Sequence, residues 1–257
     1  MPTYFITGAN RGLGRELVKQ LLESGDNHVI ATLRHLDNIP EVMVTRNPKL
    51  TVLKLDYNDP QSLVTLATEL QKMDCTIDVF IANAALNNAK SDVLNSTEEE
   101  YLNFFKVNTL GPIETLKIIK PYMLKSKSRK IIFKSSIMGS VSEFPYFLAS
   151  AYPCAPYCLS KAAMNMLSKE LSYELKPENF IVISYHPGLI DTKEKDRPND
   201  DVSIKPDFVP DEAFIKYVTK ENLSIEEAVR RELKIISELK PEDNGHFMSH
   251  DGSYLAF

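Results

Sequence analysis

A tyrosine and a lysine stand four residues apart in the segment Tyr157-Cys158-Leu159-Ser160-Lys161. Residues with this spacing share one face of a helix, so a phenol and an ammonium can point into the same cleft. The pKa of tyrosine is near 10, which makes it a poor acid or base at neutral pH, and a neighbouring cation lowers that pKa. The pair therefore indicates general acid–base chemistry, although alone it is also common on an exposed helix face.

Other polar residues follow apolar runs that are typical of strands. Ser135 and Ser136 follow the run 130–133, and Asn83 comes directly after the run 77–82. The carboxyl ends of parallel strands meet at one edge of a sheet, where ligands bind in open α/β folds. We therefore expect Ser136 and Asn83 to lie at that edge, with Asn108 on the helix that follows residue 83.

Three of the nine glycines fall in one short stretch, Thr7-Gly8-Ala9-Asn10-Arg11-Gly12-Leu13-Gly14. Gly8 permits a sharp turn, Gly12 lets the backbone approach a pyrophosphate, and Gly14 lets a helix lie close to the sheet. The stretch lies between a predicted strand and a predicted helix, which is the context that a dinucleotide-binding loop requires. This context favours a nucleotide loop over an accidental glycine turn.

The choice between the two nicotinamide cofactors depends on the end of the second strand. An acidic residue about 20 positions past the glycines binds a ribose 2′-hydroxyl, whereas an arginine accepts a 2′-phosphate. Arg34 occupies that position with no adjacent carboxylate, and Arg11 adds a second positive charge. These residues favour NADPH. Asp37 leaves a 2′-hydroxyl contact open, and Arg34 could instead be a solvated strand end.

Strands and helices alternate along the chain. Strands are predicted at 4–7, 28–33, 50–55, 77–82, 130–133, 180–184 and 246–249, and helices begin near Gly12, Pro60, Thr97 and Pro156. Thr97 and Glu100 form a capping-box pattern. Alternating elements predict right-handed βαβ units. We therefore expect an α/β fold: one Rossmann-type, doubly wound domain over residues 1–257, with a parallel sheet of about seven strands and helices on both faces.

Composition narrows the class of protein. Among 257 residues, 30 are basic and 35 are acidic, so the net charge of −5 argues against a nucleic-acid partner. No apolar run reaches the roughly 18 residues of a membrane span, and no signal peptide is visible. Three cysteines, an odd number, fit a reducing compartment. We expect a cytoplasmic protein without a membrane partner.

Two segments border the predicted catalytic residues. Residues 193–211 are rich in proline and charge, which indicates either a solvated loop or a mobile substrate flap. Their position after the sixth predicted strand favours the flap. The connection from Ser136 to Tyr157 carries four aromatic residues that line either the core or an apolar substrate pocket: Phe144, Tyr146, Phe147 and Tyr152.

Cys154 and Cys158 are four residues apart and flank Tyr157. A redox or regulatory role is one interpretation of this spacing, and packing by two small side chains is the favoured one. The five histidines show no spacing typical of metal ligands, so no metal site is predicted.

Over nearly its whole length the chain resembles the short-chain dehydrogenase/reductase family. The order and spacing of five motifs carry this resemblance: Thr7 to Gly14, Asn83-Ala84-Ala85, Ser136, Tyr157-x-x-x-Lys161 and His186-Pro187-Gly188-Leu189-Ile190-Asp191-Thr192. The residues of these motifs are most similar to those of the C-factor-like and sniffer-type NADPH-dependent carbonyl reductases. Two departures are Ala85, where the family often has glycine, and the long connection from Ser136 to Tyr157.

The resemblance implies a role for each matching residue. Tyr157 protonates the substrate carbonyl oxygen, and Lys161 lowers the tyrosine pKa and binds the nicotinamide ribose. Ser136 orients the carbonyl, and Asn108 holds a water that links Lys161 to solvent. Besides Tyr157 and Lys161, the implied cofactor residues are Gly8, Asn10, Arg11, Gly12, Leu13, Arg34, Asp56, Asn83, Ala84, Pro187, Gly188, Ile190 and Thr192.

The expected function is NADPH-dependent reduction of an aldehyde or ketone to an alcohol, with the cofactor carrying the hydride. The aromatic connection favours apolar or aromatic carbonyl substrates. Two alternatives stay open: an oxidative NAD(P)-dependent alcohol dehydrogenase, and a non-catalytic protein that senses dinucleotides. The resemblance also implies a homodimer or homotetramer.

Overall fold

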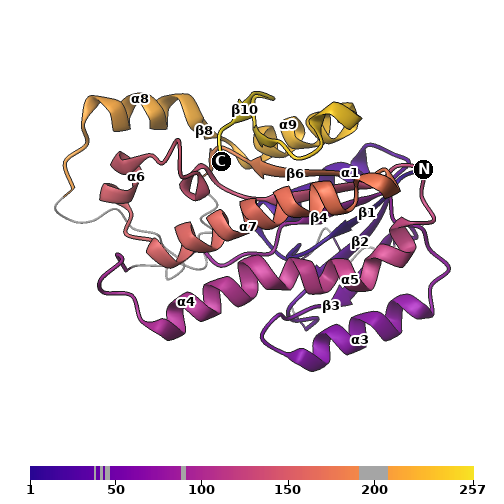
Figure 1. The fold of residues 1–257 in the computed structure, drawn as a ribbon. Helices are drawn as coiled ribbons and strands as arrows, with labels where there is room; N and C mark the ends of the chain where they lie inside the picture. Colours follow the sequence, from indigo (N-terminus) through magenta and orange to yellow (C-terminus); the bar gives the residue numbers. More distant parts are fainter. Residues whose placement is uncertain (38, 41–42, 44–46, 88–90, 191–207) are drawn as a thin grey trace.

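The structure is a computed structural model that describes residues 1–37, 39–40, 43, 47–87, 91–190 and 208–257. Its centre is an eight-stranded sheet in the order β10-β9-β6-β5-β4-β1-β2-β3 (Figure 1). The strands are β1 (Thr3–Ile6), β2 (His28–Leu33), β3 (Leu50–Lys54), β4 (Val79–Ala82), β5 (Lys130–Lys134), β6 (Ile181–His186), β9 (Phe247–Ser249) and β10 (Tyr254–Leu255).

All neighbouring strands of this sheet are parallel except β9 and β10, which are antiparallel. The expected doubly wound parallel sheet is thus confirmed. The edge strand β10 was not expected: it has two residues, and it returns after a turn in which Gly252 has a φ of 85°. Such a short strand has no periodicity that a sequence pattern could reveal.

Helices cover both faces of the sheet (Figure 1). Residues of α1 (Gly12–Glu23) and α9 (Ile225–Glu238) pack on one face, and residues of α3 (Pro60–Gln71), α5 (Gly111–Met123) and α7 (Ala155–Glu174) pack on the other. The described residues also include α4 (Glu98–Phe105), α6 (Tyr146–Ala151), α8 (Glu212–Glu221), a π-helical turn (Lys106–Leu110), 3₁₀ turns at Ile137–Gly139, Lys176–Glu178 and Pro241–Asp243, and the strand pair β7 (Leu189–Ile190) and β8 (Asn222–Leu223).

The central strands are apolar on both sides because helices bury both faces of the sheet. Phe5, Phe80 and Phe133 point to the face of α3, α5 and α7, and neighbouring pairs of these rings meet edge to face. The residues that follow or precede them in each strand point to the face of α1 and α9, as Ile6 and Ile81 do. The two cores hold the strand ends in fixed positions.

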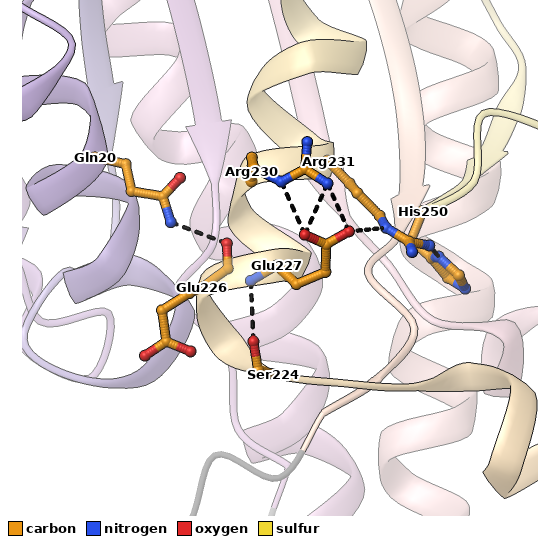
Figure 2. Close-up of polar contacts among 7 residues, drawn as sticks. All are labelled: Gln20, Ser224, Glu226, Glu227, Arg230, Arg231 and His250. Carbon is orange, nitrogen blue, oxygen red and sulfur yellow. Dashed lines mark hydrogen bonds and ion pairs between the residues drawn. The ribbon is translucent and has the colours of Figure 1, made fainter.

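Polar contacts fix the position of α9 (Figure 2). The Gln20 side chain on α1 donates a 2.9 Å hydrogen bond to the backbone carbonyl of Glu226. The Ser224 hydroxyl caps the helix by accepting from the backbone N–H of Glu227 at 3.2 Å. Arg231 pairs with Glu227 at 2.7 Å and also contacts His250 at 3.1 Å. These contacts tie α9 both to α1 and to the segment after β9.

None of the helices in the described part of the chain is long and apolar enough to span a bilayer. β1 lies between β2 and β4, so the chain winds outward from it in both directions. At such a switch point the loops leave the strand ends on opposite sides and open a crevice at the carboxyl edge. The residues expected to do chemistry follow β1, β4, β5 and β6.

Candidate active site

Close packing fixes the glycine loop after β1. Gly8 has a φ of 68°, and a Cβ atom at this residue would lie 2.7 Å from the Cα atom of Ala84. A Cβ atom at Gly14 would lie 2.6 Å from the side-chain nitrogen of Asn83 and would clash with the Gly8 carbonyl oxygen. Any larger side chain at these two positions would therefore displace the end of β4 or the loop itself.

Asn83 ties the end of β4 to this loop. Its side-chain amide donates to the carbonyl oxygens of Thr7 at 2.9 Å and Gly8 at 3.0 Å. In return, the fully buried Thr7 hydroxyl accepts from the backbone N–H groups of Asn83 at 3.1 Å and Ala84 at 3.0 Å. Thr7 was part of the motif but was not among the predicted site residues. Its hydroxyl, which follows a strand directly, was the available signal.

The N-terminus of α1 offers donors to an anion. Arg11 is the N-cap, no side chain caps the first turn, and that turn holds no acidic residue. By contrast, α3, α4, α8 and α9 each have a side chain that accepts from their first-turn N–H groups. The backbone N–H groups and the positive end of the helix dipole at Gly12 and Leu13 suit the pyrophosphate of a dinucleotide.

The other predicted cofactor residues lie along the same edge. Arg34 is exposed directly after β2. Asp56 is half-buried after β3, where its carboxylate accepts from the backbone N–H of Asn58 at 2.9 Å. Pro187, Gly188 and Ile190 are half-buried after β6, with a φ of 90° at Gly188. Asn10 is half-buried in the glycine loop. Thr192 lies outside the described residues.

The structure brings Ser136, Tyr157 and Lys161 together. Ser136 follows β5 and caps the turn Ile137–Gly139 by accepting from the backbone N–H of Met138 at 3.2 Å. Its side chain also hydrogen-bonds Tyr157 on the first turn of α7. The Lys161 ammonium, one turn further along α7, lies 5.5 Å from the centroid of the Tyr157 ring. It donates a 2.7 Å hydrogen bond to the Lys134 carbonyl oxygen.

Burial sets the charges of these groups. It lowers the pKa of the Lys161 ammonium to about 7, and the positive charge of Lys134 adds to this effect. Burial raises the pKa of the Tyr157 phenol, against the hydrogen bond from Ser136. At neutral pH the phenol therefore carries its proton, and a small change in the surroundings of Lys161 can switch its charge. The arrangement suits a proton donor, Tyr157, beside a lysine that can gain or lose its charge near neutral pH.

Asn108 lies in the π-helical turn between α4 and α5 and is fully buried. Its amide oxygen accepts from the backbone N–H of Leu86 at 2.7 Å. Its amide nitrogen donates to the Leu86 carbonyl and to the Ser160 hydroxyl, both at 2.9 Å. The Ser160 hydroxyl in turn donates to the Tyr157 carbonyl at 2.7 Å. Asn108 is thus linked to the backbone of Tyr157 through Ser160.

Two positioning residues were missed by sequence reasoning. The Ser135 hydroxyl donates to the Asn165 side-chain oxygen at 2.6 Å, and the Asn165 nitrogen donates to the Gly139 carbonyl at 3.1 Å. A Cβ atom at Gly139 would lie 2.6 Å from the backbone carbon of Lys161. These contacts lock α7 against the segment after β5. Asn165 is four residues past Lys161, so the helical spacing could have revealed it.

A buried ion pair lies behind the site. The Lys134 ammonium contacts the Glu232 carboxylate of α9 at 2.7 Å, and their side chains are 7% and 0% exposed. Burial raises the pKa of Glu232, while the charge and hydrogen bond of Lys134 oppose this rise. A lysine inside the apolar strand 130–134 was the sequence signal for such a partner.

The structure describes the side chains of two of the four aromatic residues that were predicted to line the substrate pocket. Phe144 is 40% exposed, and the Tyr152 ring lies 6.5 Å from Phe214 of α8 between centroids. Phe214 also meets Phe208 at 4.8 Å. The side chains of Tyr146 and Phe147, and residues 193–207 of the predicted flap, lie outside the described part. Tyr152 and Phe208 belong to an apolar cluster that includes Ile137, Met138, Leu148, Cys154, Tyr157, Cys158 and Phe214.

A hollow lies away from these residues. A polar groove of about 620 Å³ runs between α1 and α9, and its walls are formed by Glu16, Lys19, Gln20, Glu23, Ser24, Ser224, Glu226, Glu227 and Arg230. Two ion pairs lie in its walls: Glu16 with Lys19 at 3.5 Å, and Glu227 with Arg230 at 2.8 Å, the second of which is drawn in Figure 2. We therefore place the chemistry at the carboxyl edge of the sheet.

Within the described ranges, His, Cys, Asp and Glu side chains form no group of three or more that could hold a metal ion.

Residues 2–202 match the model of the short chain dehydrogenase family, so the chain belongs to this family of oxidoreductases. An uncharacterized oxidoreductase of Saccharomyces cerevisiae is 35% identical, over 99% of this chain and 97% of the yeast protein. Among solved structures, an NADPH-bound carbonyl reductase from chicken fatty liver has 23% identity and a TM-score of 0.83, over 100% of this chain and 99% of that one.

The carbonyl reductase Sniffer of Drosophila melanogaster is similar at 24% identity with a TM-score of 0.78, and the match covers both chains completely. At such identities the two structures show a shared fold. The resemblance found in the motifs is thereby confirmed at the level of the family and its architecture.

Proposed function

We propose that this protein is an NADPH-dependent reductase that converts an apolar or aromatic aldehyde or ketone to an alcohol. One observation carries the proposal: the Tyr157 phenol is hydrogen-bonded to Ser136, and the Lys161 ammonium lies 5.5 Å from the centroid of its ring. A phenol held between a hydroxyl and a cation is a general acid for a carbonyl oxygen. The similar carbonyl reductases from chicken and fly support the reaction class.

The cofactor would lie along the carboxyl edge. The uncapped N-terminus of α1, with Gly8, Asn10, Arg11, Gly12 and Leu13, would bind the pyrophosphate, and exposed Arg34 would pair with the 2′-phosphate. The adenine and ribose side would be bordered by Asp56, Asn83 and Ala84, and the nicotinamide side by Pro187, Gly188, Ile190 and Thr192. When bound, NADPH supplies the hydride.

Each catalytic residue has one task in this proposal. The Ser136 hydroxyl donates a hydrogen bond to the substrate carbonyl oxygen and fixes its position. The Tyr157 hydroxyl delivers its proton to that oxygen as the alcohol forms. The Lys161 ammonium stabilises the phenolate that remains, and two of its N–H donors are left for the nicotinamide ribose once one is engaged by the Lys134 carbonyl. Asn108, through Ser160, holds the first turn of α7 in place.

The substrate preference follows from the apolar cluster around Tyr152, Phe208 and Phe214. Ligand pockets are mostly apolar with a few placed polar groups, and Ser136 and Tyr157 would supply those groups. Sugars need several hydrogen-bond partners, which this cluster does not offer. We therefore expect aromatic aldehydes and hydrophobic diketones to have a higher kcat/KM than sugars and keto acids of similar size.

The test is a turnover assay with NADPH and a panel of these four carbonyl classes, together with direct measurement of NADPH binding. Reduction of the aromatic aldehyde with the highest kcat/KM is the expected result. A clear preference for the sugar or keto acid would show that the aromatic residues pack on the protein alone. Tight NADPH binding without turnover of any carbonyl would instead favour a dinucleotide sensor. Turnover only of alcohols, in a parallel assay that supplies the oxidised cofactor NADP⁺ or NAD⁺ as hydride acceptor, would favour an oxidative dehydrogenase.

We further propose a homodimer or homotetramer whose subunits meet through the helices that carry Asn108 and Tyr157. Exposed apolar side chains on these helices support this assembly: Leu102, Phe105, Leu110, Leu159 and Met166. Isolated exposed apolar residues are ordinary, but several on adjoining helices are typical of an interface. Sedimentation of the purified protein tests the assembly, and a monomer at micromolar concentration would contradict it.

A further inference from the structure

We propose that Cys154 and Cys158 form an oxidative modification site: a hydroperoxide converts the two thiols to a disulfide across the first turn of α7, and the disulfide slows the reductase. This inference rests on the proposed function, because Tyr157 is the residue that the bridge disturbs. The sequence alone favoured packing for these cysteines. The structure changes that interpretation.

The two sulfur atoms are close enough to react. Both cysteines are free thiols, and their Sγ atoms lie 3.6 Å apart. A disulfide bond is about 2.05 Å long, so a shift of roughly 1.5 Å joins them. Cys154 is buried at the N-cap of α7, whereas Cys158 is half-buried. The third cysteine, Cys75, lies between α3 and β4, and its sulfur provides an internal control.

The surroundings favour a thiolate on Cys154. It stands at the N-terminus of α7, whose first turn has no acidic residue and no side-chain cap. The positive end of a helix stabilises a thiolate, which is the nucleophilic form of cysteine. The hydrogen bond from Cys158 also lowers the pKa of the Cys154 thiol. Cys154 is therefore the attacking sulfur and Cys158 the resolving one.

The chemistry balances with a hydroperoxide as the oxidant. The Cys154 sulfur attacks the peroxide, the O–O bond breaks, and one oxygen stays on sulfur as a sulfenic acid while the other leaves as an alcohol or water. The Cys158 sulfur then attacks the Cys154 sulfur, the S–O bond breaks, and the Cys158 proton leaves with that oxygen as water. Two thiols lose two electrons, and the peroxide gains them.

The bridge acts on the site through helix geometry. Cys154 is the N-cap residue of α7 and Cys158 lies in its first turn, and their Sγ atoms must approach from 3.6 Å to about 2.05 Å for the bond to form. Closing the bridge therefore tightens the turn that contains Tyr157. The Tyr157 carbonyl is held in place by Ser160 at 2.7 Å, and Ser160 is held by Asn108 at 2.9 Å, so the backbone cannot follow freely. A displacement of about 1 Å at a catalytic group can cost about 10²-fold in rate.

The experiment treats the whole protein with hydrogen peroxide and follows three readouts. Thiol titration after unfolding is expected to fall from three thiols to one, and peptide mass mapping is expected to place the bridge between Cys154 and Cys158. Hydrogen exchange in the first turn of α7 is expected to change. The kcat for carbonyl reduction is expected to fall at least about tenfold and to return after treatment with a dithiol.

The variants separate the proposal from general oxidation. Cys154→Ser and Cys158→Ser should each keep their kcat after peroxide treatment. The kcat of Cys75→Ser should fall after the same treatment, as the kcat of the unmodified protein does. If Cys154→Ser does not fold, Cys158→Ser at the half-buried position gives the same comparison.

Three free thiols after peroxide, a bridge that includes Cys75, or a bridge that leaves both the exchange of α7 and kcat unchanged would each overturn the proposal. The thiol count, the mass map and the exchange decide the matter even if the protein reduces no carbonyl, so a failed function and a failed redox site remain distinguishable.

Discussion

The Lys161 ammonium donates a 2.7 Å hydrogen bond to the backbone carbonyl of Lys134. The side chain of Lys134 extends to the opposite face of the sheet, which α9 covers. There it meets Glu232 of α9 at 2.7 Å. One strand residue therefore joins the helix of the proposed acid to the helix that covers the opposite face of the sheet. The charge of Lys134 also contributes to the lowered pKa of Lys161.

The pH dependence of reduction should reflect Lys161. Its pKa of about 7 lies well below the usual value, so the side chain is an ammonium below pH 7 and a neutral amine above it. Only the ammonium stabilises the Tyr157 phenolate, so kcat/KM should fall as the pH rises through about 7. In Lys161→Arg the charge persists, and the decline should move to higher pH. A pH–rate profile of both proteins measures this, and the same decline in Lys161→Arg would assign it to another group.

Cofactor preference should depend on Arg34. A charge-assisted hydrogen bond to a 2′-phosphate is worth about 1.5–3 kcal/mol, which is about 10- to 160-fold in kcat/KM. We expect NADPH to be preferred over NADH, and Arg34→Asp to shift the ratio toward NADH by about that factor. Lys72→Asp makes the same charge change at the end of α3 and should leave the ratio unchanged. Equal kcat/KM for the two cofactors in the unmodified protein would refute the role of Arg34.

The buried ion pair should matter for stability when only one partner is removed. Glu232→Gln leaves the Lys134 charge buried without its counter-ion, and we expect a loss of about 3–5 kcal/mol in the free energy of unfolding. The double change Lys134→Met with Glu232→Leu should recover most of it, because no uncompensated charge remains.

Urea unfolding measures both variants of this pair. The exposed pair of Glu114 and Lys117 on α5 is the control, and Glu114→Gln there should cost less than about 1 kcal/mol. A Glu232→Gln protein as stable as the unmodified one would mean that Lys134 finds another partner or loses its proton.

Much of the architecture could be predicted because the strands are buried on both faces and stand out as apolar runs. The nucleotide loop could be predicted because glycines occur only where the chain needs them, as Gly8 and Gly14 show through their close approach to β4. The helices α8 and α9 were missed, although Ser224 caps α9 and acidic residues fill its first turn. That pattern was present in the sequence and was overlooked.

Other features have no local signal. Lys134 and Glu232 are 98 residues apart, and no spacing rule connects them. Phe214 meets Tyr152 only because α8 folds over the connection between the catalytic residues. The π-helical turn at Asn108 has a sequence that fits an α-helix equally well. Such long-range pairs and backbone irregularities depend on the folded chain and not on the periodicity of one segment.

The proposed general acid is tested most directly by Tyr157→Phe, which removes the hydroxyl and keeps the ring. We expect kcat for carbonyl reduction to fall by about 10²- to 10⁴-fold, while NADPH still binds because the loop at α1 is untouched. Tyr173→Phe makes the same substitution on an exposed position of α7 and should leave kcat unchanged. A Tyr157→Phe protein that reduces the carbonyl at a near-normal rate would contradict this role of Tyr157, because another group would then donate the proton.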